Sequence, residues 1–295
     1  MAYRRTLRQA VHCTGVGLHS GLQIHLGLLP APAGHGIRFV RTDLGSEIPA
    51  CIEYLDGVDY ATTLRRDGAS VGTVEHLLSA FYAIGVDDVR VEVDGPEVPI
   101  LDGSSAPFVL LLHQAGLRTL PLEREVIVLL EPVEVRATGK WARLVPAPAF
   151  SVSYEISFEH PLLRRQSLEL DLTLESFVEQ IAPARTFGFL SEVEALRRQG
   201  LAKGGSVDNA IVLDESGVVN GELRFEDEFV RHKVLDAVGD LALLGHPLRA
   251  RLEAHRAGHA LHVGLVRALV ARPESWMLVR PRPAARPAHA LFAEL

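Results

Sequence analysis

A chain of 295 residues with 47% hydrophobic and 23% charged residues is typical of a soluble globular protein large enough for two domains. Its net charge of −7 argues against a general nucleic-acid-binding protein, which usually has a basic excess. Two cysteines are too few for a disulfide framework, and no run of the ~18–20 apolar residues that a membrane span requires is present. The N-terminal arginines precede no apolar run of signal-peptide length, so we expect a cytoplasmic protein.

The first third of the chain is predicted to form short strands around two helices. Residues 22–28 (LQIHLGL) and 88–93 (DVRVEV) alternate as strands do, and residues 73–84 (TVEHLLSAFYAI) have the apolar stripe of a helix with Thr73 as its N-cap. A second helix is expected from near Ser105 to about Gly116. Because strands and helices follow each other without long crossovers, the predicted class is α+β rather than a doubly wound parallel sheet.

The pattern breaks over residues 117–125, and we place a domain boundary there. Strands are expected over residues 126–135, 141–146 and 150–158, and helices over 174–181, 191–199, 223–240 and 263–271. The resulting division is an N-terminal domain over 1–120, a C-terminal domain over 126–275 and an irregular, proline-rich tail over 276–295.

The helix predicted over residues 223–240 carries His232, Asp236 and Asp240 at intervals of four. Such residues stack along one face of a helix, one turn apart. An imidazole and a carboxylate one turn apart supply two of the three protein ligands that a catalytic zinc ion normally has. The alternative is that His232 and Asp236 only hydrogen-bond to each other on a solvated face.

Two further histidines are candidates for the same site. His76 follows Glu75 in the first turn of a predicted helix, where it would be a third metal ligand beside a general base. The alternative is that Glu75 complements the helix dipole and His76 lies at the edge of the core. His259 is expected in a turn between a strand over 251–254 and the last helix, where it is either functional or a surface loop residue.

Together these segments resemble one family. The motifs that carry the resemblance are RRTL (4–7), TGVGLHSG (14–21), FVRTDL (39–44), TVEHLLSA (73–80), PEVPILDGSSAPF (96–108), ARTFGF (184–189), GGSVDNAIV (204–212), LRFEDEFVRHKVLDAVGDL (223–241) and AGHA (257–260). They are similar to those of the UDP-3-O-acyl-N-acetylglucosamine deacetylase (LpxC) family, the zinc amidases of lipid A biosynthesis in Gram-negative bacteria. The resemblance runs nearly from end to end of the chain.

The resemblance implies a role for each candidate residue in hydrolysis of the sugar acetamide. His76, His232 and Asp236 would bind one zinc ion, although ferrous iron could use the same ligands. Glu75 would take a proton from the attacking water, and the hydroxyl of Thr186 would help to hold the oxyanion. His259 would be cationic and protonate the departing amine. Asp240, two turns beyond His232, would orient that imidazole, and Lys233 would add positive charge.

The resemblance also implies an architecture and a substrate. Two βααβ domains would sandwich their helices, with the site between them and an insert in each domain, at about residues 45–72 and 188–214. The second insert would form a tunnel for the 3-O-acyl chain. The implied contacts with the acyl chain and its surroundings are Leu18, Phe187, Leu190, Val193, Ala202, Val207, Ala210 and Val212. The implied contacts with the UDP group are Lys140, Phe158 and Arg256.

The expected ligand is therefore a small nucleotide-sugar lipid precursor, and the expected protein is a monomer that binds no nucleic acid. Two other classes remain open. A zinc amidase with a different substrate would keep the three ligands without an acyl tunnel. A metal-stabilised binding module would close the site with a fourth ligand, for which Cys13 or Cys51 is available.

Overall fold

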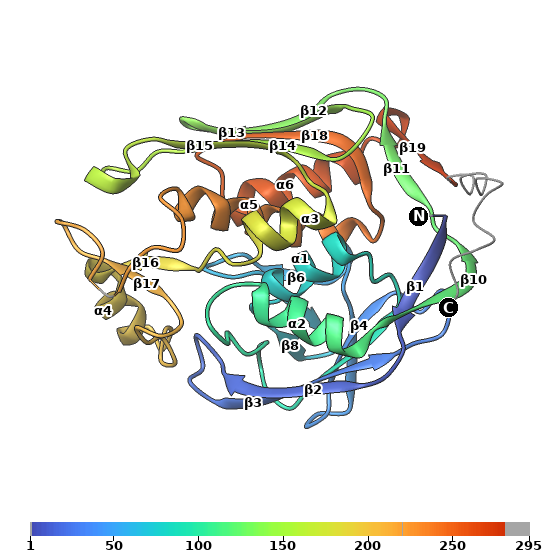
Figure 1. Ribbon diagram of the computed structural model, residues 1–295, viewed down its shortest axis with the longest axis horizontal. Coiled ribbons are helices and arrows are strands. Elements are labelled where there is room, and N and C mark those ends of the chain that lie inside the picture. The colour runs from blue at the N-terminus through green and yellow to red at the C-terminus, as the bar shows by residue number, and fades with distance from the viewer. Residues whose placement is uncertain (1, 220, 281–295) are drawn as a thin grey trace, which may run out of the picture.

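Helices lie between two outer sheets in the computed structural model, which describes residues 2–219 and 221–280 (Figure 1). The strand order of one sheet is β2-β3-β9-β4-β5. The other sheet has the order β12-β13-β18-β11-β19, and β14 pairs with both β18 and β15. Helix α1 packs on α5 in the middle of the molecule. The predicted α+β class is confirmed.

The first half of the chain builds the sheet at the bottom of Figure 1 and two helices. Its strands are β1 (Tyr3–Leu7), β2 (Val11–Val16), β3 (Gln23–Pro30), β4 (Ile37–Arg41), β5 (Ser46–Pro49), β6 (Leu55–Gly57), β7 (Thr63–Arg66), β8 (Ala69–Val71), β9 (Val89–Val93) and β10 (Leu117–Glu123). Its helices are α1 (Glu75–Ile84) and α2 (Ala106–Ala115), as predicted to within two residues, and the turn Ile52–Tyr54 is 3-10 helical. The alternation in β3 is confirmed, because Ile24, Leu26 and Leu28 are all buried.

The second half builds the sheet at the top of Figure 1. Its strands are β11 (Val126–Leu129), β12 (Val133–Ala137), β13 (Lys140–Pro146), β14 (Ser151–Ile156), β15 (Gln166–Asp171), β16 (Phe187–Phe189), β17 (Ile211–Leu213), β18 (Leu248–His255) and β19 (Trp276–Val279). Its helices are α3 (Leu174–Ser176), α4 (Leu190–Arg198), α5 (Glu228–Leu241) and α6 (His259–Val270), with 3-10 turns at Pro161–Leu163, Ala242–Leu244 and Pro273–Ser275.

The two segments expected as inserts each contain strands that pair outside the two large sheets. Strands β6, β7 and β8, within residues 45–72, pair as a three-stranded sheet of their own. Residues 188–214 hold α4 and most of the parallel pair β16–β17, which together project at the left of Figure 1. We call the segment 187–213 the arm.

Several local predictions were wrong. Thr73 is not the N-cap of α1: Val74 is, and Thr73 instead adopts a positive φ of 55° and donates a hydrogen bond to Glu97. The break in the pattern expected over 117–125 is strand β10, which pairs with β1, while the domain boundary placed there stays a prediction; the single strand over 126–135 is interrupted between β11 and β12. The errors in the strands arise because partner strands far away in sequence, and not local pattern, decide where a strand forms.

The C-terminal third also differs from expectation at three points. The helix over 174–181 is one α-helical turn followed by a π-helical turn, Phe177–Ile181. The last helix begins at His259, four residues before its predicted start. Trp276–Val279 form a strand against β11, although they were expected to be irregular, and residues 281–295 of the predicted tail lie outside the described residues.

Candidate active site

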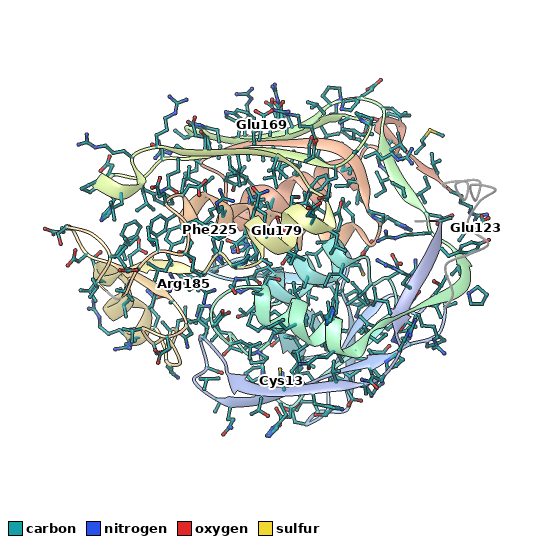
Figure 2. The ribbon with its side chains drawn as sticks, in the orientation of Figure 1. Cys13, Glu123, Glu169, Glu179, Arg185 and Phe225 are labelled. Atoms are coloured by element: carbon teal, nitrogen blue, oxygen red, sulfur yellow. The ribbon has the colours of Figure 1, made fainter. Side chains whose placement is uncertain are left out.

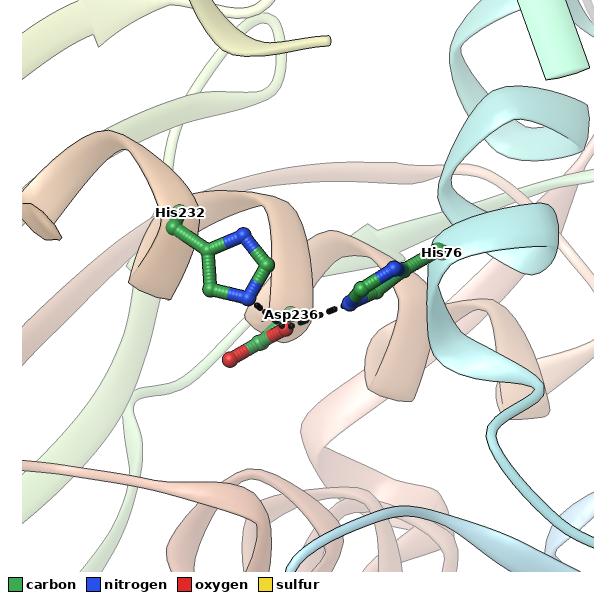
Figure 3. A group of neighbouring side chains, drawn as sticks. All are labelled: His76, His232 and Asp236. Atoms are coloured by element: carbon green, nitrogen blue, oxygen red, sulfur yellow. Dashed lines mark ion pairs between the residues drawn. The ribbon is translucent and has the colours of Figure 1, made fainter. Parts of the chain in front are cut away.

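His76 from α1 and His232 and Asp236 from α5 point toward one another between the two helices (Figure 3). Oδ1 of Asp236 lies 3.3 Å from Nε2 of His232 and 3.6 Å from Nε2 of His76. All three side chains are buried. Ligands bound about 2.0–2.2 Å from a tetrahedral zinc ion are separated from each other by about 3.4 Å. The three atoms therefore already have the spacing of a metal-ligand set.

The protonation of these groups suits a cation. Nδ1 of His232 lies 3.1 Å from the carbonyl of Ala184, so Nδ1 carries the proton and the lone pair of Nε2 faces the other ligands. Burial, only partly opposed by Asp236, lowers the pKa of His232 to about 3. Burial alone would raise the pKa of Asp236, but His232 and Lys233 hold it well below its usual value. The set thus contains a neutral imidazole beside an ionised carboxylate.

Of the remaining polar atoms of the set, the second oxygen of Asp236 has a partner and Nδ1 of His76 has none among the described residues. Lys233 Nζ donates to Oδ2 of Asp236 at 2.8 Å, which leaves Oδ1 directed at the histidines. The rings of His76 and His232 meet edge to face with centroids 5.0 Å apart. Nδ1 of His76 is buried and has no hydrogen-bond partner among the described residues.

Glu75 and His259 lie on either side of the space next to this set. Oε2 of Glu75 accepts a hydrogen bond from the backbone N–H of Thr62, while Oε1 lies 3.9 Å from Nε2 of His259. That same Nε2 lies 3.9 Å from Oδ2 of Asp236. Burial raises the pKa of Glu75, against the opposing effect of His259 and His76. A buried carboxyl with a raised pKa beside an imidazole is the arrangement expected of an acid–base pair.

Asp240 holds the imidazole of His259. Its Oδ2 lies 2.8 Å from Nδ1 of His259, whereas Nδ1 of His232 faces the carbonyl of Ala184 and not Asp240. Burial disfavours the cation, but Asp240 outweighs it and the pKa of His259 rises to about 9. Asp240 stays ionised, because His259 lowers its pKa against the effect of burial.

Three residues near Asp240 were not predicted. Thr62 Oγ1 donates to Asp240 Oδ1, His262 Nδ1 lies 2.9 Å from Oδ2, and Tyr154 contacts the far nitrogen of His262. His259 and His262 are three residues apart, a spacing that places two side chains on the same face of a helix. Because His259 was expected in a turn, this spacing did not predict a role for His262.

Thr186 and Phe187 lie at the base of the arm, next to Arg185, which Figure 2 labels there. The N–H of Thr186 donates to Gly103, and its carbonyl accepts from Ile211. Arg185 binds the buried Glu228 at the start of α5. The ring of Phe187 lies 6.2 Å from that of His232, and Lys233 Nζ lies 5.4 Å from its centroid.

The other predicted acyl-chain residues lie along the arm and beside it. The carbonyl of Leu18 accepts a hydrogen bond from Gly204, so the loop before β3 docks on the arm. Leu190 and Val207 are exposed, by 47% and 60%. The partly buried residues are Leu18, Val193, Ala202, Ala210 and Val212. Val212 lies between the fully buried Ile211 and Leu213, so its side chain faces away from the core beneath β17.

The three predicted UDP contacts meet in one cleft. Lys140, Phe158 and Arg256 line a space of about 530 Å³ whose wall also includes Lys233 and His259. Segments 116 residues apart in sequence thus bring two cationic side chains and an aromatic ring into the cleft that His259 also lines. This arrangement can receive an anionic, planar group.

The cysteines do not join the metal-ligand set. Cys13 is on β2 and Cys51 follows β5, and neither belongs to the group formed by His76, His232 and Asp236 within the described parts of the chain. Burial raises the pKa of Cys51 to about 12, so its thiol is not ionised near neutral pH. A closed site with cysteine as fourth ligand is therefore disfavoured. No helix in residues 2–219 and 221–280 is long and apolar enough to cross a membrane.

Comparison with known proteins gives one consistent result. The family described as UDP-3-O-acyl N-acetylglycosamine deacetylase matches residues 4–271. Proteins named UDP-3-O-acyl-N-acetylglucosamine deacetylase from Myxococcus xanthus and Anaeromyxobacter dehalogenans are 50% and 51% identical over 282 and 278 residues, which cover 95% and 94% of this chain and 90% of each relative. One from Chromobacterium violaceum is 48% identical over 282 residues, or 94% of this chain and 93% of the relative.

Proposed function

The chain belongs to the UDP-3-O-acyl-N-acetylglucosamine deacetylase family, and from that premise we propose how it works. It hydrolyses the acetamide of UDP-3-O-acyl-N-acetylglucosamine to the free amine and acetate, the committed step of lipid A biosynthesis. His76, His232 and Asp236 would hold one zinc ion for this reaction, and the same ligands would equally suit ferrous iron. The observation that carries this proposal is the spacing of 3.3 and 3.6 Å between the Asp236 oxygen and two imidazole nitrogens.

Glu75 and His259 divide the proton transfers between them. Glu75 takes the proton of the water that adds to the acetamide carbonyl, a role that suits its raised pKa. His259, cationic below about pH 9, gives its Nε2 proton to the nitrogen as the C–N bond breaks. Acetate and an amine are released, and the two residues exchange their protons with solvent before the next cycle.

Other groups stabilise the negative charge that develops on the carbonyl oxygen. A bound divalent ion supplies Lewis acidity, which polarises a carbonyl and lowers the pKa of water. The hydroxyl of Thr186 donates to the oxyanion, and its backbone is held on both sides by Gly103 and Ile211. Lys233 adds a cation beside Asp236 and lines the UDP cleft as well.

The substrate spans two regions. The UDP group occupies the cleft lined by Lys140, Phe158 and Arg256, where the diphosphate meets the cations and the uracil meets the ring. The 3-O-acyl chain follows the arm, between Leu18 and Val212. Every proposed group comes from one chain, which fits a monomer, and we place the reaction in the cytoplasm.

The substrate assignment is tested by acetate release from UDP-3-O-acyl-N-acetylglucosamine and from UDP-N-acetylglucosamine. Release from the acylated substrate alone is the expected result. Release that is indifferent to the acyl chain would support a sugar amidase of different specificity. No release from folded, zinc-loaded protein would overturn the proposal.

A further inference from the structure

The carboxylate of Asp240 is the centre of a buried network with three donors. Its Oδ2 lies 2.8 Å from Nδ1 of His259 and 2.9 Å from Nδ1 of His262, and its Oδ1 accepts a 2.5 Å bond from Thr62 Oγ1. Asp240 is completely buried, and His262 is 1% exposed. An ionised carboxylate can only accept hydrogen bonds, so both imidazoles carry a proton on Nδ1.

His262 connects this carboxylate to the outer sheet. Its Nε2 lies 2.8 Å from the hydroxyl of Tyr154, a buried residue of β14. Burial lowers the pKa of His262 and raises that of Tyr154 well above its ordinary value, so the ring is neutral and the phenol keeps its proton. The phenol therefore donates to Nε2, and Nδ1–H donates to Asp240.

The same directions of donation distinguish this network from a metal site. Ligand atoms of Asp240, His259 and His262 also lie within 4.8 Å of one another. Here, however, both imidazoles present N–H groups to a single oxygen, whereas a metal ion needs their lone pairs. The network stabilises an anion and does not offer a place for a cation.

Three bonds from different directions restrict the carboxylate more than one bond can. Without His262, Thr62 would still hold Oδ1, but Oδ2 would have His259 as its only partner and could shift together with that ring. His259 Nε2 must face Glu75 Oε1, 3.9 Å away, for the pair to act on one substrate. Catalytic groups generally need positioning to about 0.5 Å by the residues behind them.

We propose that His262 is a positioning residue for the deacetylation, held in turn by Tyr154. Its Nδ1–H fixes the orientation of Asp240, which fixes His259 toward the reacting atoms. The proposal rests on the proton-donor role given to His259 in the proposed function. His262 itself touches neither the ligand set nor the UDP cleft as described above.

Two double variants separate the donor from the bulk of the ring. Tyr154→Phe with His262→Asn keeps an N–H on the atom attached to Cγ, where Nδ1 is in histidine. Tyr154→Phe with His262→Leu has the same shape without a donor. Both remove the hydroxyl that would otherwise be left buried and unpaired, so both should fold.

The expected result is that the asparagine variant keeps most of the wild-type kcat and the leucine variant loses about 10–100-fold, the usual effect of residues that orient an active-site group. KM and bound zinc should be equal in the two, and both variants should unfold cooperatively. A second readout is the Nδ1 proton of His259 in imidazole 15N–1H spectra of the zinc-loaded protein, which should be protected from exchange in wild type and asparagine variant only.

Equal kcat in the two variants, whether both high or both low, would overturn the proposal, since the donor would then make no difference. If wild-type protein releases no acetate, the proposed function fails instead. In that case the exchange protection of the His259 Nδ1 proton still shows whether His262 positions Asp240 and His259 or only fills space in the core.

Discussion

The backbone of Gly239 in α5 lies directly against the backbone of Glu75 in α1. A Cβ atom at position 239 would overlap the carbonyl oxygen of Glu75. This approach matters because Glu75 and His76 begin α1, while Asp236 and Asp240 lie on either side of Gly239 along α5. Because residue 239 is glycine, α1 and α5 can approach this closely, and this approach sets the distance between the site residues on the two helices.

Gly239→Ala should destabilise the protein and reduce activity together. An added methyl group in a packed core typically costs about 1–3 kcal/mol, and here the neighbour is backbone, which cannot rotate away. Gly264→Ala is the matched control, since its Cβ would meet Val135 only at 4.0 Å, and alanine favours a helix by about 1 kcal/mol over glycine. Urea unfolding and acetate release measure both effects. An active Gly239→Ala variant of wild-type stability would contradict this account of the helix contact.

Substitutions of Glu75 and Asp236 should have different effects on zinc binding and on kcat. Glu75→Gln should keep zinc and lose about 10²–10⁴-fold in kcat, because it removes a general base but no ligand. Asp236→Ala should lose zinc affinity, because it removes the oxygen that both imidazoles face. Zinc content after dialysis, measured beside kcat, checks the division. Equal zinc loss in the two variants would show that Glu75 is a ligand.

The activity should fall on the alkaline side as His259 loses its proton. A pKa raised to about 9 keeps the cation present at neutral pH, and a bound divalent ion nearby would lower that value, so the alkaline limb should lie at or below pH 9. Asp240→Asn removes the carboxylate that raises the pKa, and the limb should move to lower pH. The pH profile of kcat/KM measures both. If the alkaline limb of the profile moves to higher pH in Asp240→Asn, the group that titrates there is not His259.

Binding of the 3-O-acyl chain should weaken when a larger side chain is placed on the face of β17 that points away from the core. Val212→Trp adds volume on the side of β17 that faces away from the core, so KM for a long-chain substrate should rise more than KM for a short-chain one. Leu130→Trp is the control, because Leu130 is 50% exposed and directly follows β11, which lies on the opposite side of Figure 1 from the arm. If the ratio of the long-chain KM to the short-chain KM is the same in Val212→Trp and Leu130→Trp, the acyl chain binds elsewhere.

Much of the site could be predicted because helix periodicity is local. His232, Asp236 and Asp240 recur every four residues, so a helix must place them on one face wherever it packs. Adding His76 and His259 needed the resemblance, since α1, α5 and α6 meet only in the folded chain. His262 was missed because the start of α6 was placed four residues late, and Thr62 and Tyr154 because isolated hydroxyl groups carry no sequence pattern.

The fold shows the same division between local and distant causes. The α1 stripe and the β3 alternation are periodic within one segment, and both predictions were right. Strand β10 and strand β19 exist because β1 and β11 lie beside them, and neither has an alternation that stands out. Thr73 fails as an N-cap because Glu97, 24 residues later, takes its hydroxyl.

The central claim is that His76, His232 and Asp236 hold a divalent ion on which deacetylation depends. Its most direct test is acetate release from UDP-3-O-acyl-N-acetylglucosamine by the purified wild-type protein before chelation, after chelation and after zinc is returned. Activity should be lost on chelation and restored by about one zinc ion per chain, the number that one three-ligand site holds. Full activity in protein shown to be metal-free would contradict the claim, because the ligand set would then have no part in the reaction.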